Sequence, residues 1–295
     1  MTWLILAFLS AVFSAVSTIF EKKSLFSLDA LNFSYIVSIA TLVFSIPFFF
    51  AVPQAPSGIS LLILFIKTIL NAAAFLFVML SLKNLELSEA LPLLAVSPAF
   101  VAVLAFLFVG DDLIAKEWIG IFLIVAGTYI LELKKQNGSI FDPFKTFLKS
   151  PKYIHVLTAV VLFTITALMD RILLKNFKLP PYTFMAYQHL FYAVFFVIVI
   201  ASTKRNIIVP FKTLNIETFI LILLVAGLTI VYRYTQIEAV KLAPVALVLA
   251  VKRLSVLIAI IIGGKLFKEA NLWRRITATL IILAGISLIA NSGAM

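Results

Sequence analysis

Ten apolar segments constrain the fold of this chain more than any other feature of its sequence. A helix needs about 20 predominantly apolar residues to cross a bilayer. Within lipid, a helix satisfies its backbone polar groups inside its own segment. The sequence therefore predicts an all-α, multi-pass protein of the cell membrane with ten transmembrane helices. The ten segments are residues 2–20, 30–52, 59–82, 88–109, 115–133, 153–175, 181–202, 214–236, 242–268 and 271–291.

The composition agrees with this class of protein. Of the 295 residues, 63% are hydrophobic and only 13% are charged, whereas about 25% are charged in a typical soluble domain. The formal net charge is +11, but the cations sit in short loops and in a few spans. This placement favours contact with anionic lipid headgroups. It leaves no basic patch on a soluble element, so we expect no nucleic acid partner.

Signatures of enzymes, metals and cofactors are missing from the sequence. Cysteine is absent, which excludes thiolate zinc sites and cysteine nucleophiles. The chain also has no paired metal-ligand spacing, no phosphate-cradling glycine loop and no nucleophile elbow. We therefore expect a protein that is not an enzyme and that needs no cofactor or metal.

The two halves of the chain are similar to each other, with small changes of register that loop insertions would produce. Five spans in each half is an odd number, so two equivalent halves must cross the membrane in opposite directions. Secondary transporters use this inverted-repeat plan and bind substrate between the repeats near the midplane. The matched residues are Glu21 with Asp170 at a shift of 149, Lys83-Asn84 with Glu238-Ala239 and Ala95-Val96 with Ala250-Val251 at a shift of 155, and Asp111 with Glu269 and Ala126-Gly127 with Ala284-Gly285 at a shift of 158.

The longest polar interval divides the chain into these halves. Residues 134–152 hold Gly138, Asp142-Pro143 and Pro151, which are typical of a linker. We predict a first five-helix repeat over residues 1–137, a linker over 138–152 and a second five-helix repeat over 153–295.

Two adjacent cations, Lys252 and Arg253, lie near the centre of the ninth apolar segment. Each costs about 2.5–3.5 kcal/mol at the centre of a membrane helix, so the pair should face a polar interior. There it would form the floor of a cavity that binds a phosphate or carboxylate. The alternative interpretation is an internal ion pair with a carboxylate from another span.

Other polar residues within the spans are candidates for substrate binding. Lys67 is central in the third span, and Asn71 follows one helical turn later on the same face; either a substrate contact or structural pairing would explain Lys67. Arg233 would contact substrate or extend to the lipid headgroups, and Tyr232 would bind a ligand or belong to an aromatic belt. His189 would be a site residue or a hydrogen-bonded interior histidine.

Two carboxylates at matched positions, Glu21 and Asp170, are candidates for a gate or for coupling to protons. Their alternative interpretation is interfacial charge at the ends of helices. Because no nucleotide-binding motif is present, transport would be driven by a coupling proton or by exchange with a counter-substrate.

The motifs of the two halves resemble those of the drug/metabolite transporter superfamily, and within it the ten-span EamA family. The similar segments run from Ser97-Pro98 through Asp111 to Ala126-Gly127, and from Gly263-Gly264 through Lys268-Glu269 to Ala284-Gly285. The family usually has Gly-Glu where this chain has Gly110-Asp111-Asp112, a departure in residue but not in charge. The resemblance covers nearly the whole chain. It implies two inverted five-helix bundles, a central cavity and alternating access for small metabolites.

The same superfamily includes plastid sugar-phosphate translocators, which bind phosphate with a Lys-Arg pair on the ninth span. Residues 251–256, Val-Lys-Arg-Leu-Ser-Val, look similar to that segment. The resemblance implies a phosphate-binding role for Lys252 and Arg253 alone.

We therefore expect a secondary transporter that moves a small organic anion or zwitterion by alternating access. One alternative is an exporter of amino acids or neutral metabolites in which the buried cations are structural. A remote alternative is a membrane-embedded enzyme or scaffold. The distribution of Lys and Arg places both termini outside, whereas the family resemblance implies cytoplasmic termini. The sequence does not fix the oligomeric state, and a homodimer is one of the states that it allows.

Overall fold

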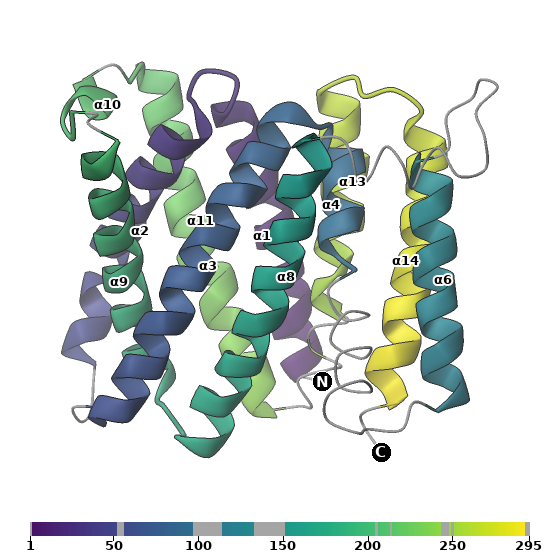
Figure 1. Cartoon of the computed structure of the whole chain (residues 1–295), viewed down its shortest axis with the longest axis horizontal. Helices are drawn as coiled ribbons and strands as arrows, with labels where there is room; N and C mark the ends of the chain where they lie inside the picture. The colour runs from purple at the N-terminus through teal and green to yellow at the C-terminus, as the bar shows by residue number, and fades with distance from the viewer. Residues whose placement is uncertain are drawn as a thin grey trace.

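The computed structural model describes residues 2–51, 56–96, 114–132, 151–203, 206–212, 214–242, 248 and 251–292. The regular structure in these residues is helical (Figure 1). The helices are α1 (Thr2–Ser24), α2 (Ala30–Phe50), α3 (Gly58–Asn84), α4 (Leu87–Leu94), α6 (Ala115–Glu132), α8 (Pro151–Arg171) with the π-helical turn η2 (Ile172–Asn176), α9 (Pro181–Ser202), α10 (Val209–Lys212), α11 (Ile216–Leu242), α13 (Leu254–Leu266) and α14 (Leu272–Ser292).

The described helices match the predicted spans well. Five of them are long and apolar enough to cross a membrane: α1, α2, α3, α9 and residues 216–239 of α11. The predicted spans 88–109 and 242–268 are described only in part, as α4 and α13, and residues 97–113 lie outside the described part. The linker predicted at 138–152 also lies outside it, except for its last two residues. The division into two repeats at that linker stays a prediction.

Helix starts follow from local capping. The Asp29 side chain accepts hydrogen bonds from the backbone N–H groups of Leu31 and Asn32, each at 3.1 Å. Ser57 accepts one from the N–H of Ser60 at 3.2 Å. These contacts satisfy N–H groups that have no partner inside the first helical turn.

The main helix contacts join the two predicted repeats. Helix α1 packs on α11, α3 on α8, α2 on α9 and α6 on α14. Helices α1 and α11 are the first and eighth spans, and α3 and α8 are the third and sixth. Exchanging the two halves turns the α1–α11 pair into the α3–α8 pair. The same exchange turns each of the other two pairs into itself. The α2–α9 pair lies at one end of the molecule and the α6–α14 pair at the other (Figure 1). This packing is what two equivalent, inverted halves would produce.

The two ends of the helices differ in what they carry. Helix α1 starts and α14 ends at the same end (Figure 1), which we call the terminal side. The opposite end holds Ser24, Asn84 and Pro151, where α1 and α3 end and α8 begins. We call this end the linker side.

Two glycines at matched positions let α6 and α14 approach closely. A Cβ at Gly285 would lie 2.5 Å from the carbonyl oxygen of Gly120, and one at Gly127 would lie 2.9 Å from that of Ala278. Both distances are to backbone atoms, so a methyl group would force the helices apart. Helix contacts of this kind in membranes depend on small residues.

Replacing either of these glycines with alanine should weaken the α6–α14 contact. We expect Gly127→Ala and Gly285→Ala each to lower the free energy of unfolding by about 1–3 kcal/mol, the usual cost of overpacking. Thermal denaturation of the purified protein in detergent measures this. The control is Gly227→Ala on α11, whose added Cβ would meet only Phe44, at 3.9 Å. Melting temperatures equal to that of the control would contradict the prediction.

Candidate functional site

Lys67 is held by an ion pair between the two predicted repeats. Its side chain on α3 is fully buried, with 0% of its surface exposed. The Nζ atom lies 2.7 Å from a carboxylate oxygen of Asp170 on α8. It also donates a hydrogen bond of 2.9 Å to Gln188 on α9 and lies 4.7 Å from the centre of the Phe184 ring. The structure thus places the Lys67 charge against protein groups, as structural pairing requires.

Lys252 instead makes contacts with neutral side chains of α11. Its Nζ donates a hydrogen bond to the Gln236 side chain and lies 5.0 Å from the centre of the Tyr232 ring. Tyr232 and Gln236 are one helical turn apart and so face the same direction. The Ser10 hydroxyl of α1 donates to the Tyr232 carbonyl at 2.8 Å. Lys252 therefore points toward neighbouring helices.

Arg233 lies beside the same tyrosine. Its guanidinium carbon is 6.0 Å from the centre of the Tyr232 ring, near the outer limit for a cation–π contact. Among the described residues, neither Arg233 nor Lys252 forms an ion pair with a carboxylate. Arg253 follows Lys252 at the start of α13 and is half-buried.

The predicted cations converge on one region of the structure. Arg233, Arg253 and Asp170 lie close enough to Lys252 for their charges to act on it. Arg233 also acts on Lys67 and on the buried His189. We call Lys67, Asp170, Arg233, Lys252 and Arg253 the cationic cluster. It draws on α3, α8, α11 and the start of α13.

Asn71 is buried, and the contact that it shows is through its backbone. The Tyr192 hydroxyl of α9 donates to the Asn71 carbonyl at 3.3 Å. The substrate contact expected from the Asn71 side chain stays a prediction.

The two carboxylates that the sequence matched have different surroundings. Asp170 pairs with Lys67, and 30% of its side-chain surface is exposed. Glu21 is buried near the linker-side end of α1 and accepts a hydrogen bond from Ser17 at 3.1 Å. No described cation forms an ion pair with Glu21. The expected role of the two carboxylates, in a gate or in coupling to protons, stays a prediction.

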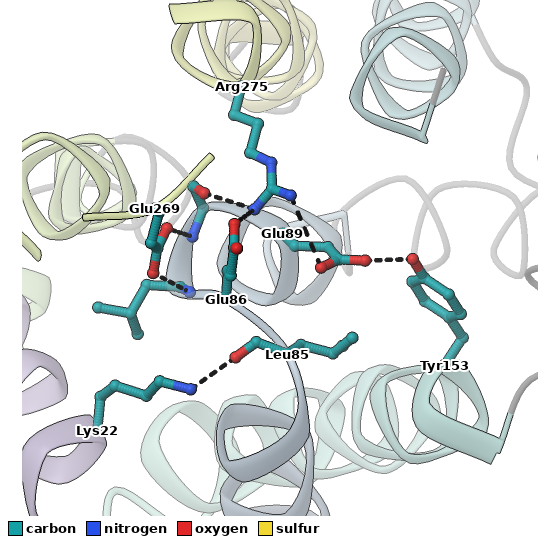
Figure 2. A network of polar contacts seen from close by, with 9 residues as sticks. Lys22, Leu85, Glu86, Glu89, Tyr153, Glu269 and Arg275 are labelled. Carbon is teal, nitrogen blue, oxygen red and sulfur yellow. Dashed lines mark hydrogen bonds and ion pairs between the residues drawn. The ribbon is translucent and has the colours of Figure 1, made fainter. Parts of the chain in front are cut away.

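A second polar cluster lies on the linker side and was not predicted as a site (Figure 2). In the sequence, Glu269 was recognised only as part of a motif, and Arg275 was not singled out. The available signal was the run Glu86-Leu87-Ser88-Glu89 ahead of an apolar stretch, which is typical of a helix start. We call this set the linker-side cluster; it comprises Lys22, Glu86, Glu89, Tyr153, Glu269 and Arg275.

A pocket of about 330 Å³ opens between α2, α9 and α11. Its lining is apolar and aromatic, and the Tyr182 and Tyr234 rings stack with their centres 6.0 Å apart. None of the residues predicted as a site lines this pocket. The lining residues are Phe48, Tyr182, Ile230, Val231, Tyr234 and Thr235.

Among the described residues, no group of three or more His, Cys, Asp or Glu could hold a metal ion.

Comparison with known proteins decides the family. The model of the EamA-like transporter family matches residues 1–133 and 150–291, which is most of the chain. The chain belongs to the EamA-like transporter family. It is therefore an integral multi-pass membrane protein with the ten-span drug/metabolite transporter fold, and it is a transporter rather than an enzyme. The remote alternative of a membrane-embedded enzyme or scaffold is not supported.

A solved structure supports the fold of this EamA-like transporter. It is described only as the crystal structure of a protein and is 13% identical in sequence. It aligns with a TM-score of 0.64 over 99% of this chain and 97% of its own. At this identity the likeness concerns the fold alone. No curated protein matches the chain.

Proposed function

We propose that this EamA transporter moves a small organic anion by alternating access, with the cationic cluster as its binding site. The observation that carries the proposal is the set of contacts made by Lys252. Its ammonium group lies against a neutral amide and an aromatic ring, so no described carboxylate neutralises it by direct contact. A cation inside the membrane calls for a counter-charge. An anionic substrate would supply it.

Arg233 and Arg253 would complete the binding of the anion. Arginine forms two parallel hydrogen bonds with a phosphate or carboxylate, whereas lysine acts as a point charge. The charges of both arginines act on Lys252. This mutual repulsion is relieved when an anion binds. The Tyr232 ring would keep Lys252 and Arg233 oriented, because both lie near its centre.

Substrate would reach each side of the membrane by rocking of one half against the other. The proposed site fits this motion because its cations come from both predicted repeats. Gradients or exchange would drive transport, with a proton or a counter-substrate as the coupled species.

A zwitterion such as an amino acid is the second candidate. Asp170 is the observation that favours it, because its carboxylate is part of the cationic cluster and is 30% exposed. An ammonium group could bind there while the substrate carboxylate binds near Lys252. In the related alternative, neutral metabolites are exported and the cations only stabilise the structure.

Counterflow into sealed proteoliposomes tests the proposal. Vesicles are preloaded with phosphate esters, dicarboxylates, amino acids or neutral sugars, and uptake of the labelled solute is measured. We expect an anion to exchange, and Lys252→Met and Arg253→Met to reduce that exchange at least about tenfold, the loss expected from one charge-assisted contact. The control is Lys116→Met, which removes an exposed cation of α6. Transport of neutral solutes that both variants retain would overturn the proposal.

A further inference from the structure

The linker-side cluster fastens the start of α4 to the opposite half of the protein. The Glu269 carboxylate lies between α13 and α14 and accepts hydrogen bonds from the backbone N–H groups of Leu87, at 2.6 Å, and Ser88, at 2.9 Å. The residue before α4, Glu86, makes no side-chain capping contact of its own. The cap of this helix is therefore supplied by the second predicted repeat.

Arg275 and Tyr153 add further contacts across the same boundary (Figure 2). The Arg275 guanidinium of α14 donates to the Glu86 carboxylate and to the Ser88 hydroxyl, the latter at 2.8 Å. It also lies 3.9 Å from a carboxylate oxygen of Glu89. The Tyr153 hydroxyl of α8 donates to Glu89 as well. The start of α4 is thus held from two sides by the second predicted repeat.

Close packing of apolar side chains also joins α4 to α13 and α1 next to these polar contacts. A Cβ at Gly263 would lie 2.5 Å from the Leu87 side chain and 3.3 Å from that of Ile19. Helix α13 therefore sits directly against α4 and α1. Lys22 holds the adjoining turn by donating hydrogen bonds to the carbonyls of Leu82 and Leu85, the latter at 2.7 Å.

These contacts are stronger than those of an ordinary surface pair. Only 11% of the Arg275 side chain is exposed, against 20% of the Glu89 side chain and 39% of the Glu86 side chain, and Leu87 and Ser88 are fully buried. Solvent screening removes most of the value of exposed ion pairs. Partial burial and hydrogen bonds to charged groups preserve it here.

We infer that the linker-side cluster is a gate, closed in this structure, which must open for solute to pass on the linker side. The inference rests on the proposed alternating-access function. In it, the second half moves away from α4, the Glu269 cap is withdrawn and the Arg275 contacts to Glu86 and Glu89 break. The carbonyl bonds of Lys22 stay within the first half and keep α1 and α3 together during that motion.

The sequence repeats one ion pair of this arrangement, Glu86 with Arg275, with its charges exchanged. A shift of 155 places Lys241 at the position of Glu86, and a shift of 158 places Glu117 at the position of Arg275. The side chains of Lys241 and Glu117 lie outside the described part of the structure. Each predicted half thus provides residues of opposite charge at the equivalent positions. A gate of this kind on each side is what alternating access requires.

Thiol accessibility tests the gate without any knowledge of the substrate. The chain has no cysteine, so one reporter can be introduced without other changes. The Ala90→Cys reporter lies on α4, one turn beyond Glu86, where the side chain is fully buried. The Ala186→Cys reporter on α9 is equally buried and lies away from the cluster. The rate of reaction of each reporter with a water-soluble maleimide is measured in nanodiscs.

Glu269→Gln is expected to increase the reaction rate at the Ala90→Cys reporter about tenfold, the shift that follows from weakening a hydrogen bond to a charged group. Tyr153→Phe, which removes one hydroxyl and spares the cap, should give a smaller increase. Lys23→Gln is the matched control, because it removes an ion pair with Glu217 on the same side that is largely exposed. It should leave the rate unchanged, and all variants should leave the Ala186→Cys reporter unchanged.

Two outcomes would overturn the gate. One is an unchanged rate at the Ala90→Cys reporter in both cluster variants, with the proteins still monodisperse. The other is an equal increase at both reporters, which would show general loosening. The result is separate from the transport proposal. If Glu269→Gln increases labelling of the Ala90→Cys reporter but no anion is transported, only the proposed substrate is overturned. If an anion is exchanged but the labelling does not change, only the gate is overturned.

Discussion

Asp170→Asn is expected to destabilise the protein by about 3–5 kcal/mol, because it leaves a buried lysine without its counter-charge. Lys67 has no exposed surface, and its other polar contact is the neutral Gln188 side chain. The Phe184 ring, 4.7 Å away, offsets only part of the loss. The yield of monodisperse protein and the melting temperature in detergent measure the effect.

Removing the other partner of the ion pair should lower the stability of the protein less. Lys67→Met leaves the Asp170 carboxylate without a partner, but 30% of that side chain is exposed, and water or the remaining cations of the cluster can compensate it. The double variant Lys67→Met with Asp170→Asn should recover most of the stability, because neither charge remains buried and unpaired.

Comparing the two single variants with the double variant also decides the role of Lys67. A structural ion pair predicts a large loss in Asp170→Asn that the double variant reverses. If Lys67 binds substrate directly, Lys67→Met would keep its stability and lose transport, and the double variant would not recover it. Equal melting temperatures for all three variants would contradict the structural role. The control is Lys116→Met on the exposed surface, which should change neither quantity.

The spans were predictable because lipid imposes a simple physical condition on sequence. Helix α9 covers residues 181–202 as predicted, since Pro181 fixes its first turn. Helix α1 extends beyond the predicted end at residue 20, to Ser24. Glu21 and Lys22 end the apolar run in the sequence, yet their side chains are buried against neighbouring helices. Apolar content alone cannot reveal an end of this kind.

The polar residues of the candidate site could be singled out from the sequence, but their contacts could not. The cost of charges in lipid singled out Lys67, Arg233, Lys252 and Arg253, and the structure brings them together. Which of them is neutralised depends on the packing of distant helices. The internal repeat matches Asp170 with Glu21 and not with Lys67. The ion pair between Lys67 and Asp170 therefore could not be predicted from the repeat. The cap that Glu269 provides likewise depends on where α4 begins.

Glu21→Gln is expected to abolish proton-driven accumulation while leaving the stability of the protein equal or higher. Glu21 is buried, and its side chain contacts Ser17 on the same helix. At a shift of 155, the position that corresponds to Lys67 is Ile222, which is buried and apolar. The first predicted repeat therefore has the carboxylate, but the second lacks the cation that would match it.

A buried carboxylate that no described cation neutralises is costly to the folded state, and a use of its charge in transport would account for that cost. Glutamine keeps the shape and the capacity to accept the Ser17 hydrogen bond, but it cannot bind and release a proton. We expect about 1–3 kcal/mol of stabilisation, comparable to the cost of an uncompensated buried polar group. The match with Asp170 makes Asp170→Asn the comparison variant, for which a loss of stability is expected instead.

Uptake into proteoliposomes with and without an imposed pH gradient measures the coupling. The wild-type protein should concentrate its solute when the gradient is present, whereas Glu21→Gln should only equilibrate it by exchange. Ser17→Ala, which removes the hydroxyl but keeps the carboxylate, should retain coupling. If Glu21→Gln still concentrates solute, Glu21 is not the coupling group. If neither protein responds to the gradient while exchange persists, a counter-substrate drives transport, and the Glu21 carboxylate has a structural role only.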